Sequence, residues 1–448
     1  MVEATADPVG NDLGISETSI LSTPPSTLER GDQPAWLAER RHAAWNRFLA
    51  TPAPVITDQT WRFSKLKQLD FSSVGYAEES SRVDDLVDQS GDIEEVAARF
   101  VFVNESLVSH EVHDEGMEAQ GVKVLPLAEA LVDLGDVVEN HFMAREAKLG
   151  SEKWAALHEA SAESGVVVFV PKGVVVEKPI EIIHWVDGEN VAIFPHTLIV
   201  AEELAQVSVV DQFLSADDTS SNWVIGCNDL VTEKGAKVGY HAFQRLNESS
   251  RAILLNNATA ERDATTTSFT LNLGGHWVRT ENMSYVAGEG ANSYMLAISL
   301  PLEGQEFDQR TFQHHMAPHT VSDLLFKNAL FGKSRTVFSG LIMVDEGAHF
   351  TDAYQTCRNL LNSEKAEANS MPGLEINADQ VKCSHGSTSA QIDRDELFYF
   401  LARGIDESAA RVMIIDGYTH EVTDKINDEQ IEGLISKLVA KRLAQVDV

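Results

Sequence analysis

The sequence predicts a mainly β protein whose core is a parallel β-helix flanked by helical regions at both ends. Three observations predict this fold class. From Gly165 onward, about 200 residues form short β-rich runs with scarcely any helical periodicity. Within that stretch, turn-like triplets recur about every 28 residues. Apolar residues follow helical spacing only before about residue 160 and again after Ile392.

The first 33 residues resemble neither a secretory signal peptide nor an Arg-rich transit peptide. They include Glu3, Asp7 and Glu17, and no basic residue precedes Arg30. Their Ser, Thr and Pro content predicts a flexible tail over residues 1–33.

Residues 34–160 are expected to form a mixed, largely helical N-terminal domain. Helical patterning occupies residues 36–50 and returns between Leu125 and Leu157, with one alternating strand over residues 99–112 between them. The change of pattern near Gly165 predicts a domain boundary there, with the β-helix core over residues 161–390.

The repeat in the core consists of triplets that precede alternating, strand-like runs. These triplets are Glu203-Leu204-Ala205, Lys234-Gly235-Ala236, Arg262-Asp263-Ala264, Glu289-Gly290-Ala291 and Glu346-Gly347-Ala348. The last gap is close to two periods, with Pro318-His319-Thr320 near its midpoint, and Asn377-Ala378 lies one period further on. A β-propeller needs a longer repeat, whereas a solenoid coil of this length is reasonable. Ordinary turns in an acidic chain would give the same triplets, so the repeat alone leaves both interpretations open.

The C-terminal residues 391–448 are predicted to form a small helical domain. Asp393-Arg394-Asp395-Glu396 resembles a capping box at a helix start. A second helix is predicted by one apolar face, with Asn427 as its plausible cap; the face comprises Ile431, Leu434, Ile435, Leu438 and Val439.

Composition excludes several classes of function. The formal net charge of −34 would repel nucleic acid and anionic membranes. Three cysteines in 448 residues cannot form a disulfide framework, which fits a reducing cytoplasm. No apolar run approaches the length that spans a bilayer. We therefore expect a cytoplasmic, globular protein.

Cys383 and His385 are the candidate metal ligands. One residue separates them, so both side chains would lie on the same face of a strand, directly before the predicted helix start. Taken alone, the pair is a weak signal, because a closed zinc site needs four ligands. A buried thiol beside a hydrogen-bonded histidine is the plainer interpretation.

Two other motifs carry less weight. His314, His315 and His319 have metal-like spacing, but Pro318 disfavours the helix that would align them, so a turn with hydrogen-bonded histidines is expected. Gly332-Lys333-Ser334 lacks the upstream glycine of a phosphate-binding loop, so the chain is not a P-loop ATPase and a β-turn is expected.

Several long stretches of the chain resemble the SufB/SufD family of scaffold proteins in the SUF iron–sulfur cluster assembly system. They are PAWLAERRHAAWNRF (34–48), GVVVFVPKGVVVEKPIEI (165–182), FPHTLIVAEELAQVSVV (194–210), residues 314–368 and PGLEINADQVKCSHGSTSAQIDRDELFYFLARGI (372–405). Cys383 to Gly386 match the SufD form of this family, whereas the SufB form typically carries a Glu-His-Glu type motif there. SufB also has core cysteines proposed to receive sulfur, whereas this chain has only Cys227, Cys357 and Cys383.

The resemblance implies a right-handed parallel β-helix and a non-catalytic scaffold. This scaffold would act with SufB and the ATPase SufC, in which ATP hydrolysis resides, to build nascent clusters and to help acquire iron. It also implies a heterodimer with SufB. Because exposed strand edges are templates for pairing, we expect this heterodimer to form through strand addition near the C-terminal coils, with homodimers when SufB is absent. Cys383 and His385 would be iron or cluster ligands at that interface, holding a transient cluster with no permanently bound cofactor. The C-terminal helices would dock SufC, with Leu397, Phe398 and Arg403 as candidate contacts. The alternative is a β-helix enzyme acting on acidic polysaccharide, which lacks support from an export signal or a basic surface.

Overall fold

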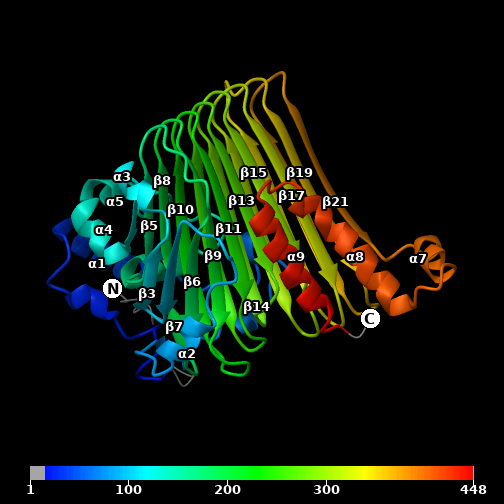
Figure 1. Cartoon of the computed structure of the whole chain (residues 1–448), viewed down its shortest axis with the longest axis horizontal. Helices are drawn as coiled ribbons and strands as arrows, with labels where there is room; N and C mark the ends of the chain where they lie inside the picture. Colours follow the sequence, from blue (N-terminus) through cyan, green and yellow to red (C-terminus); the bar gives the residue numbers. More distant parts are fainter. Residues whose placement is uncertain (1–15, 447–448) are drawn as a thin grey trace, which may run out of the picture.

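The computed structural model describes residues 16–446, and its core is a parallel β-helix of about eight coils built from two sheets (Figure 1). Sheet A contains β5 (Gly165–Val170), β8 (His196–Ala201), β10 (Trp223–Thr232), β12 (Arg251–Ala260), β14 (Trp277–Val286), β16 (Glu306–His315), β18 (Arg335–Val344) and β20 (Glu367–Ile376). Sheet B contains β6 (Ile180–Val186), β9 (Gln206–Ser215), β11 (Lys237–Arg245), β13 (Thr265–Asn272), β15 (Asn292–Ser299), β17 (Val321–Leu330), β19 (Asp352–Leu361) and β21 (Lys382–Ala390). The predicted mainly β fold with a β-helix core is confirmed.

The repeated triplets mark one corner of the solenoid, where each strand of sheet A turns into the next strand of sheet B. Their alanines are fully buried; they are Ala205, Ala236, Ala264, Ala291 and Ala348. The residue before each alanine has a positive φ, a conformation that a tight turn imposes; these residues are Leu204, Gly235, Asp263, Gly290 and Gly347. His319, at the predicted midpoint of the long gap, has the same conformation. The triplets are therefore structural repeats and not incidental turns.

The interior of the solenoid is polar in its middle coils. Side chains of the two sheets pair across the lumen by hydrogen bonds, in the pairs Asn256–Ser268 (3.1 Å), Ser284–Ser293 (2.6 Å), Gln309–Ser299 (3.0 Å) and Gln313–Ser322 (2.8 Å). These residues are all buried, and such groups are tolerated inside a protein when they bond to one another. The pairs connect the two sheets in register, coil by coil.

The N-terminal region covers the outer face of sheet A and extends both sheets. Its helices are α1 (Ala35–Ala50), α2 (Val83–Asp88), α3 (Glu115–Ala119), α4 (Leu127–Asp133), α5 (Gly135–His141) and α6 (Glu152–Ser161), with short 3₁₀ turns at Ser26–Glu29, Gln59–Trp61 and Leu66–Gln68. Strands β2 (Ala98–Val103) and β3 (Ser106–Val112) extend sheet B, β4 (Lys123–Pro126) extends sheet A, and β1 (Gly75–Tyr76) pairs with β7 (Val191–Ile193). The sheets thus begin well before residue 161.

Residues 16–33, expected to belong to a flexible tail, are packed against the N-terminal region. The side chain of Ile20 is fully buried, and its backbone N–H donates to the carbonyl of Val74 at 2.8 Å. The Ser19 hydroxyl donates to the carbonyl of Phe71 at 2.7 Å. Ser and Thr therefore serve here as buried hydrogen-bonding groups, and the tail prediction is wrong for this segment. Residues 1–15 of the predicted tail lie outside the described residues.

A buried ion network fastens the segment around Trp61 to sheet A. The Arg279 guanidinium donates to Asp308 at 2.6 Å and lies 3.8 Å from the centroid of the Trp61 ring. Arg310 also donates to Asp308, at 2.6 Å. All three charged side chains are buried, so each depends on its partners for the interactions that water would otherwise supply.

The C-terminal helices lie at the other end of the chain. They are α7 (Arg394–Leu401), α8 (Glu407–Thr423) and α9 (Glu429–Leu443). The predicted apolar face of α9 is buried, while the helix is capped by Asp428 instead of Asn427. Helices α8 and α9 lie against sheet B, whereas α7 projects away from the solenoid (Figure 1). Among the residues described, no helix is both long and apolar enough to cross a membrane.

Candidate metal-ligand site at the open end of the β-helix

The last coil of the solenoid has no further coil stacked on it within the described residues. Strands β20 and β21 are the terminal strands of sheets A and B, so each leaves one row of backbone N–H and C=O groups without a strand partner. No residue of β20 is buried, and every residue of β21 except Cys383 is exposed. The preceding strands β18 and β19 keep their inward residues buried. The solenoid therefore presents an open end.

Cys383 and His385 lie on this open end, both on β21. Their register partners on β19 are Ala353 and Gln355, which are buried inside the solenoid. Cys383 packs against the apolar cluster that includes Ala353, so it faces inward, and His385 shares its face because strand side chains alternate. The predicted same-strand geometry of the pair is confirmed, and both side chains lie where the next coil would stack.

The pair provides two donor atoms of different character. Burial and the nearby Asp352 carboxylate raise the pKa of the Cys383 thiol, so a metal ion must displace its proton before the sulfur can bind. His385 is exposed to solvent. No third metal-binding side chain of the described residues converges with them. Zn²⁺ and iron sites in proteins generally have three or four protein ligands, so the pair alone is an incomplete site.

The three histidines at positions 314, 315 and 319 do not converge. His314 is hydrogen-bonded to Asp345 at 2.9 Å, whereas His315 bonds inside the solenoid to Thr320 at 2.7 Å and Ser322 at 2.8 Å. His319 lies in the turn and stacks on Phe350. The expected turn is confirmed at His319, whereas the hydrogen-bonded His314 and His315 lie at the end of β16 instead of in the turn.

Gly332-Lys333-Ser334 also forms a turn, as expected from the sequence. The Ser334 N–H donates to the carbonyl of Phe331 at 3.0 Å, and the Lys333 N–H donates to Glu303 at 2.9 Å. The turn joins β17 to β18 at the second corner of the coil.

The candidate partner contacts lie on or just after α7, which begins at the predicted N-cap Asp393. Phe398 is 68% exposed and Leu397 is half-buried. The Arg403 guanidinium lies 3.4 Å from the centroid of the Tyr399 ring and donates to the Tyr399 carbonyl. Arg403 thus stabilises the end of α7, and Phe398 is the free apolar side chain among the three.

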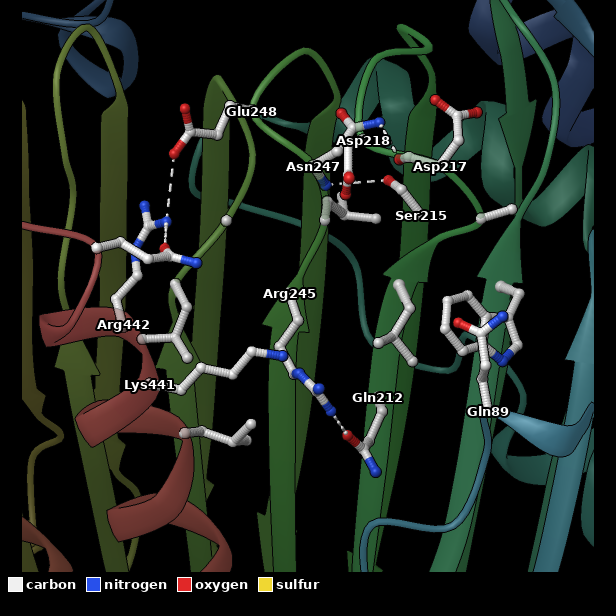
Figure 2. Close-up of a pocket in the computed structure, with 18 of the residues that line it drawn as sticks. Gln89, Gln212, Ser215, Asp217, Asp218, Arg245, Asn247, Glu248, Lys441 and Arg442 are labelled. Carbon is white, nitrogen blue, oxygen red and sulfur yellow. Dashed lines mark hydrogen bonds and ion pairs between the residues drawn. The ribbon is translucent and has the colours of Figure 1, made fainter. Parts of the chain in front are cut away.

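A cleft of about 1460 Å³ lies on the outer face of sheet B, between the end of α9 and the segment after α2 (Figure 2). Its three arginines already have partners, and Arg82 pairs with Asp85 at 3.0 Å. Arg245 donates to Gln212 at 2.7 Å and pairs with Asp92, and Arg442 bonds to Glu248 at 3.2 Å (Figure 2). The cleft is separate from the Cys383–His385 end, and its paired arginines leave little net positive charge for an anionic ligand.

Comparison with known families gives matches over most of the chain. Residues 184–418 match the family described as SUF system FeS cluster assembly, SufBD core domain. Residues 26–182 match the SufBD protein N-terminal region. The family match covers the solenoid, including its open end.

Several curated proteins are similar to the chain. Iron-sulfur cluster assembly protein SufD of Escherichia coli is 31% identical over 302 residues, which cover 65% of this chain and 70% of that protein. The SufD of Bacillus subtilis is 26% identical over 424 residues, covering 93% and 95%. Iron-sulfur cluster assembly protein SufB of Bacillus subtilis is 25% identical over 410 residues, covering 88% and 87%. These similarities favour cluster assembly over a polysaccharide-cleaving enzyme.

The exposure of His385 predicts that His385→Ala leaves the free energy of unfolding within about 0.5 kcal/mol of the unsubstituted chain. His315→Ala is the matched control, because its ring makes two buried hydrogen bonds, and its removal should cost about 1–3 kcal/mol. Denaturant unfolding followed by circular dichroism measures both. An equal loss in the two variants would contradict an exposed, unpaired His385.

Proposed function

The chain belongs to the SufBD family of SUF-system iron–sulfur cluster assembly proteins, and on that premise we propose that it is a non-catalytic scaffold subunit that shares a nascent cluster or iron with a SufB-type paralogue. The observation that carries the proposal is the Cys383–His385 pair on the open end of the solenoid. Iron and the cluster are cargo of this scaffold.

The open end supports pairing with a second solenoid. Strands β20 and β21 span ten and nine residues, and their free edges can accept strands from another chain through backbone hydrogen bonds. A paralogue with matching coils has edges of the same length and spacing. A second copy of this chain has them too, so homodimers are expected when the paralogue is absent.

The donor set supports cargo shared between two chains. A thiolate and an imidazole suit iron in mixed Cys/His cluster sites, and two ligands leave positions for the partner to fill. Because the pair lies at the edge where the partner would bind, the complete site would form at the interface between the subunits. Separation of the subunits would then release or expose the cargo.

Helix α7 supports docking of an ATPase partner of the SufC type, in which ATP hydrolysis would reside. It carries exposed aromatic residues and packs little on its own chain, in contrast to α8 and α9. Leu397, Phe398 and Arg403 are the proposed contact and support residues. Three free cysteines support a cytoplasmic setting for this assembly.

The ligand proposal predicts that His385→Ala abolishes cluster assembly in cells while the complex with SufB and SufC still forms. Cys383→Ser should have an equal or milder effect, since a hydroxyl is a poor ligand for a soft site but nearly isosteric. Iron and sulfide content of the purified complex, measured beside its subunit stoichiometry, provides the test. A stable complex with normal cluster content in the absence of His385 would exclude the ligand role.

The edge-pairing proposal predicts that Ser387→Pro weakens association with the paralogue without unfolding the chain. The Lys382 N–H donates to Thr351 of the preceding coil, and alternate residues of a parallel strand bond to the same side, so the Ser387 N–H faces the free edge. Proline at position 387 therefore removes one N–H donor from the proposed interface and none from the pairing with β19.

Thr388→Pro is the control for that experiment, because its N–H faces β19 and its loss should lower the melting temperature of the isolated chain. Co-purification with the paralogue and thermal unfolding are measured on both variants. Unchanged association of the Ser387→Pro chain would argue against strand addition at this edge.

The docking proposal predicts that Phe398→Ser weakens binding of the ATPase at least tenfold and leaves the melting temperature unchanged, since its ring is mostly exposed. Ile56→Ser, at an apolar residue that is 85% exposed in the N-terminal region, is the control. Truncation of the whole C-terminal region is unsuitable because it would uncover the apolar face beneath α8 and α9. Equal binding by the Phe398→Ser and Ile56→Ser chains would rule out this helix as the dock.

A further inference from the structure

Three metal-binding side chains converge on the outer face of sheet A, away from the open end. Cys227 of β10 and His196 of β8 are register partners on adjacent strands, so their side chains lie side by side on one face. Helix α6 lies over that face and places His158 beside His196 and Cys227. All three side chains are fully buried, and their ligand atoms lie within 4.8 Å of one another.

The spacing of the two imidazoles matches that of ligands on one ion. Nε2 of His158 and Nδ1 of His196 are 3.2 Å apart. Two nitrogens bound to a tetrahedral zinc ion at about 2.0–2.1 Å lie about 3.3 Å apart. Nδ1 of His158 is 2.7 Å from the carbonyl of Ile225, to which it must donate, so Nε2 carries the lone pair that a metal requires.

The surrounding groups leave one buried atom without a partner. If the two rings bond only to each other, Nδ1 of His196 must carry the proton, because Nε2 of His158 cannot. Nε2 of His196 then turns a lone pair toward Asp229 Oδ2 at 3.5 Å, and no hydrogen bond satisfies it. With an ion on Nδ1, the proton moves to Nε2 and faces that carboxylate, which is the usual orienting group behind a metal-bound histidine.

The thiol also has an orienting neighbour. The Asn257 amide donates to Asp229 at 3.1 Å and lies 3.8 Å from the sulfur of Cys227, so one side chain connects the ligand and the orienting carboxylate. The Phe142 ring covers His196 at a centroid distance of 4.4 Å and excludes solvent from that side. The cluster thus has three donors, a carboxylate behind one of them and an apolar cover.

We propose that His158, His196 and Cys227 form a buried site for one thiophilic transition-metal ion of the zinc(II) class, which joins α6 to sheet A. Two imidazoles and a thiolate are the ligands that borderline-soft ions prefer over calcium or magnesium. Because the donors are enclosed, the ion enters while α6 docks on the sheet and is retained afterwards. This site is independent of the cargo ligands Cys383 and His385.

The test uses the full chain with those cargo ligands removed as Cys383→Ser/His385→Ala, so that any retained ion belongs elsewhere. The chain is produced in cells grown with zinc or with cobalt and purified without chelator. We expect one equivalent of zinc, and in the cobalt preparation a thiolate-to-cobalt charge-transfer absorption in the near ultraviolet. Absence of both in the folded chain would overturn the proposal, because a purely hydrogen-bonded cluster holds no ion.

Cys227→Ser in the same background should lose the absorption and the equivalent of metal. Cys357→Ser is the matched control, since this thiol is equally buried but lies inside the solenoid next to asparagine side chains. If Cys227→Ser does not fold, anomalous diffraction at the zinc edge from the parent chain decides, with a peak expected between the three donors. A folded Cys227→Ser chain that keeps its metal, or a peak elsewhere, would refute the assignment.

Discussion

The register of the coils is the constraint on which the rest of the structure depends. Each strand pairs residue for residue with the strand one coil away, and the pairing continues without a shift from β8 to β21. The corners after β8, β10, β12, β14, β16 and β18 keep this register, because a residue with positive φ and a buried small residue return the chain to the same position. A slip of one residue would exchange the inward and outward faces of a strand. The register therefore decides which side chains share the lumen and which share the outer face.

The same constraint creates the open end. In a stack of repeated coils, each coil provides backbone hydrogen-bonding partners only for its neighbours. The last coil therefore leaves one edge unpaired unless another element covers it. At the N-terminal end, the antiparallel strands β3 and β4 extend the sheets and change their direction. At the other end β20 and β21 receive no such cover from the described residues, and the chain departs into α7. The unpaired edge and the Cys383–His385 pair occupy the same coil, so the proposed partner edge and the proposed ligands lie together.

The solenoid and one of the two proposed donor sets could be predicted from the sequence. The triplet ending in Ala205 and its successors revealed the coil length, because a corner requires the same backbone conformation each time. Cys383 and His385 were found because period-two spacing is local. The His158–His196–Cys227 cluster was missed, although Cys227 follows His196 by one coil of the repeat and the register could have paired them. The contribution of α6 could not be predicted, since helix docking depends on the apolar face around Trp223, which is assembled from separate coils. The packing of Ile20 likewise depends on residues distant in the sequence.

Cys383 and Cys227 carry the same thiol group, but they differ in whether a bound ion could leave while the chain stays folded. Cys383 lies on the last strand of sheet B, on which no other described strand stacks, so an ion held there could exchange with a partner or with solvent. Cys227 lies in the middle of sheet A beneath a helix, so an ion held there is released only when α6 leaves the sheet. Transfer of cargo requires the first arrangement, because the site must be taken apart without unfolding the chain. A bond between the N-terminal region and the solenoid requires the second, because its contribution to stability is lost if the ion can leave from the folded state. The two proposed roles therefore follow from where each cysteine lies in the solenoid, one at its open end and one beneath α6.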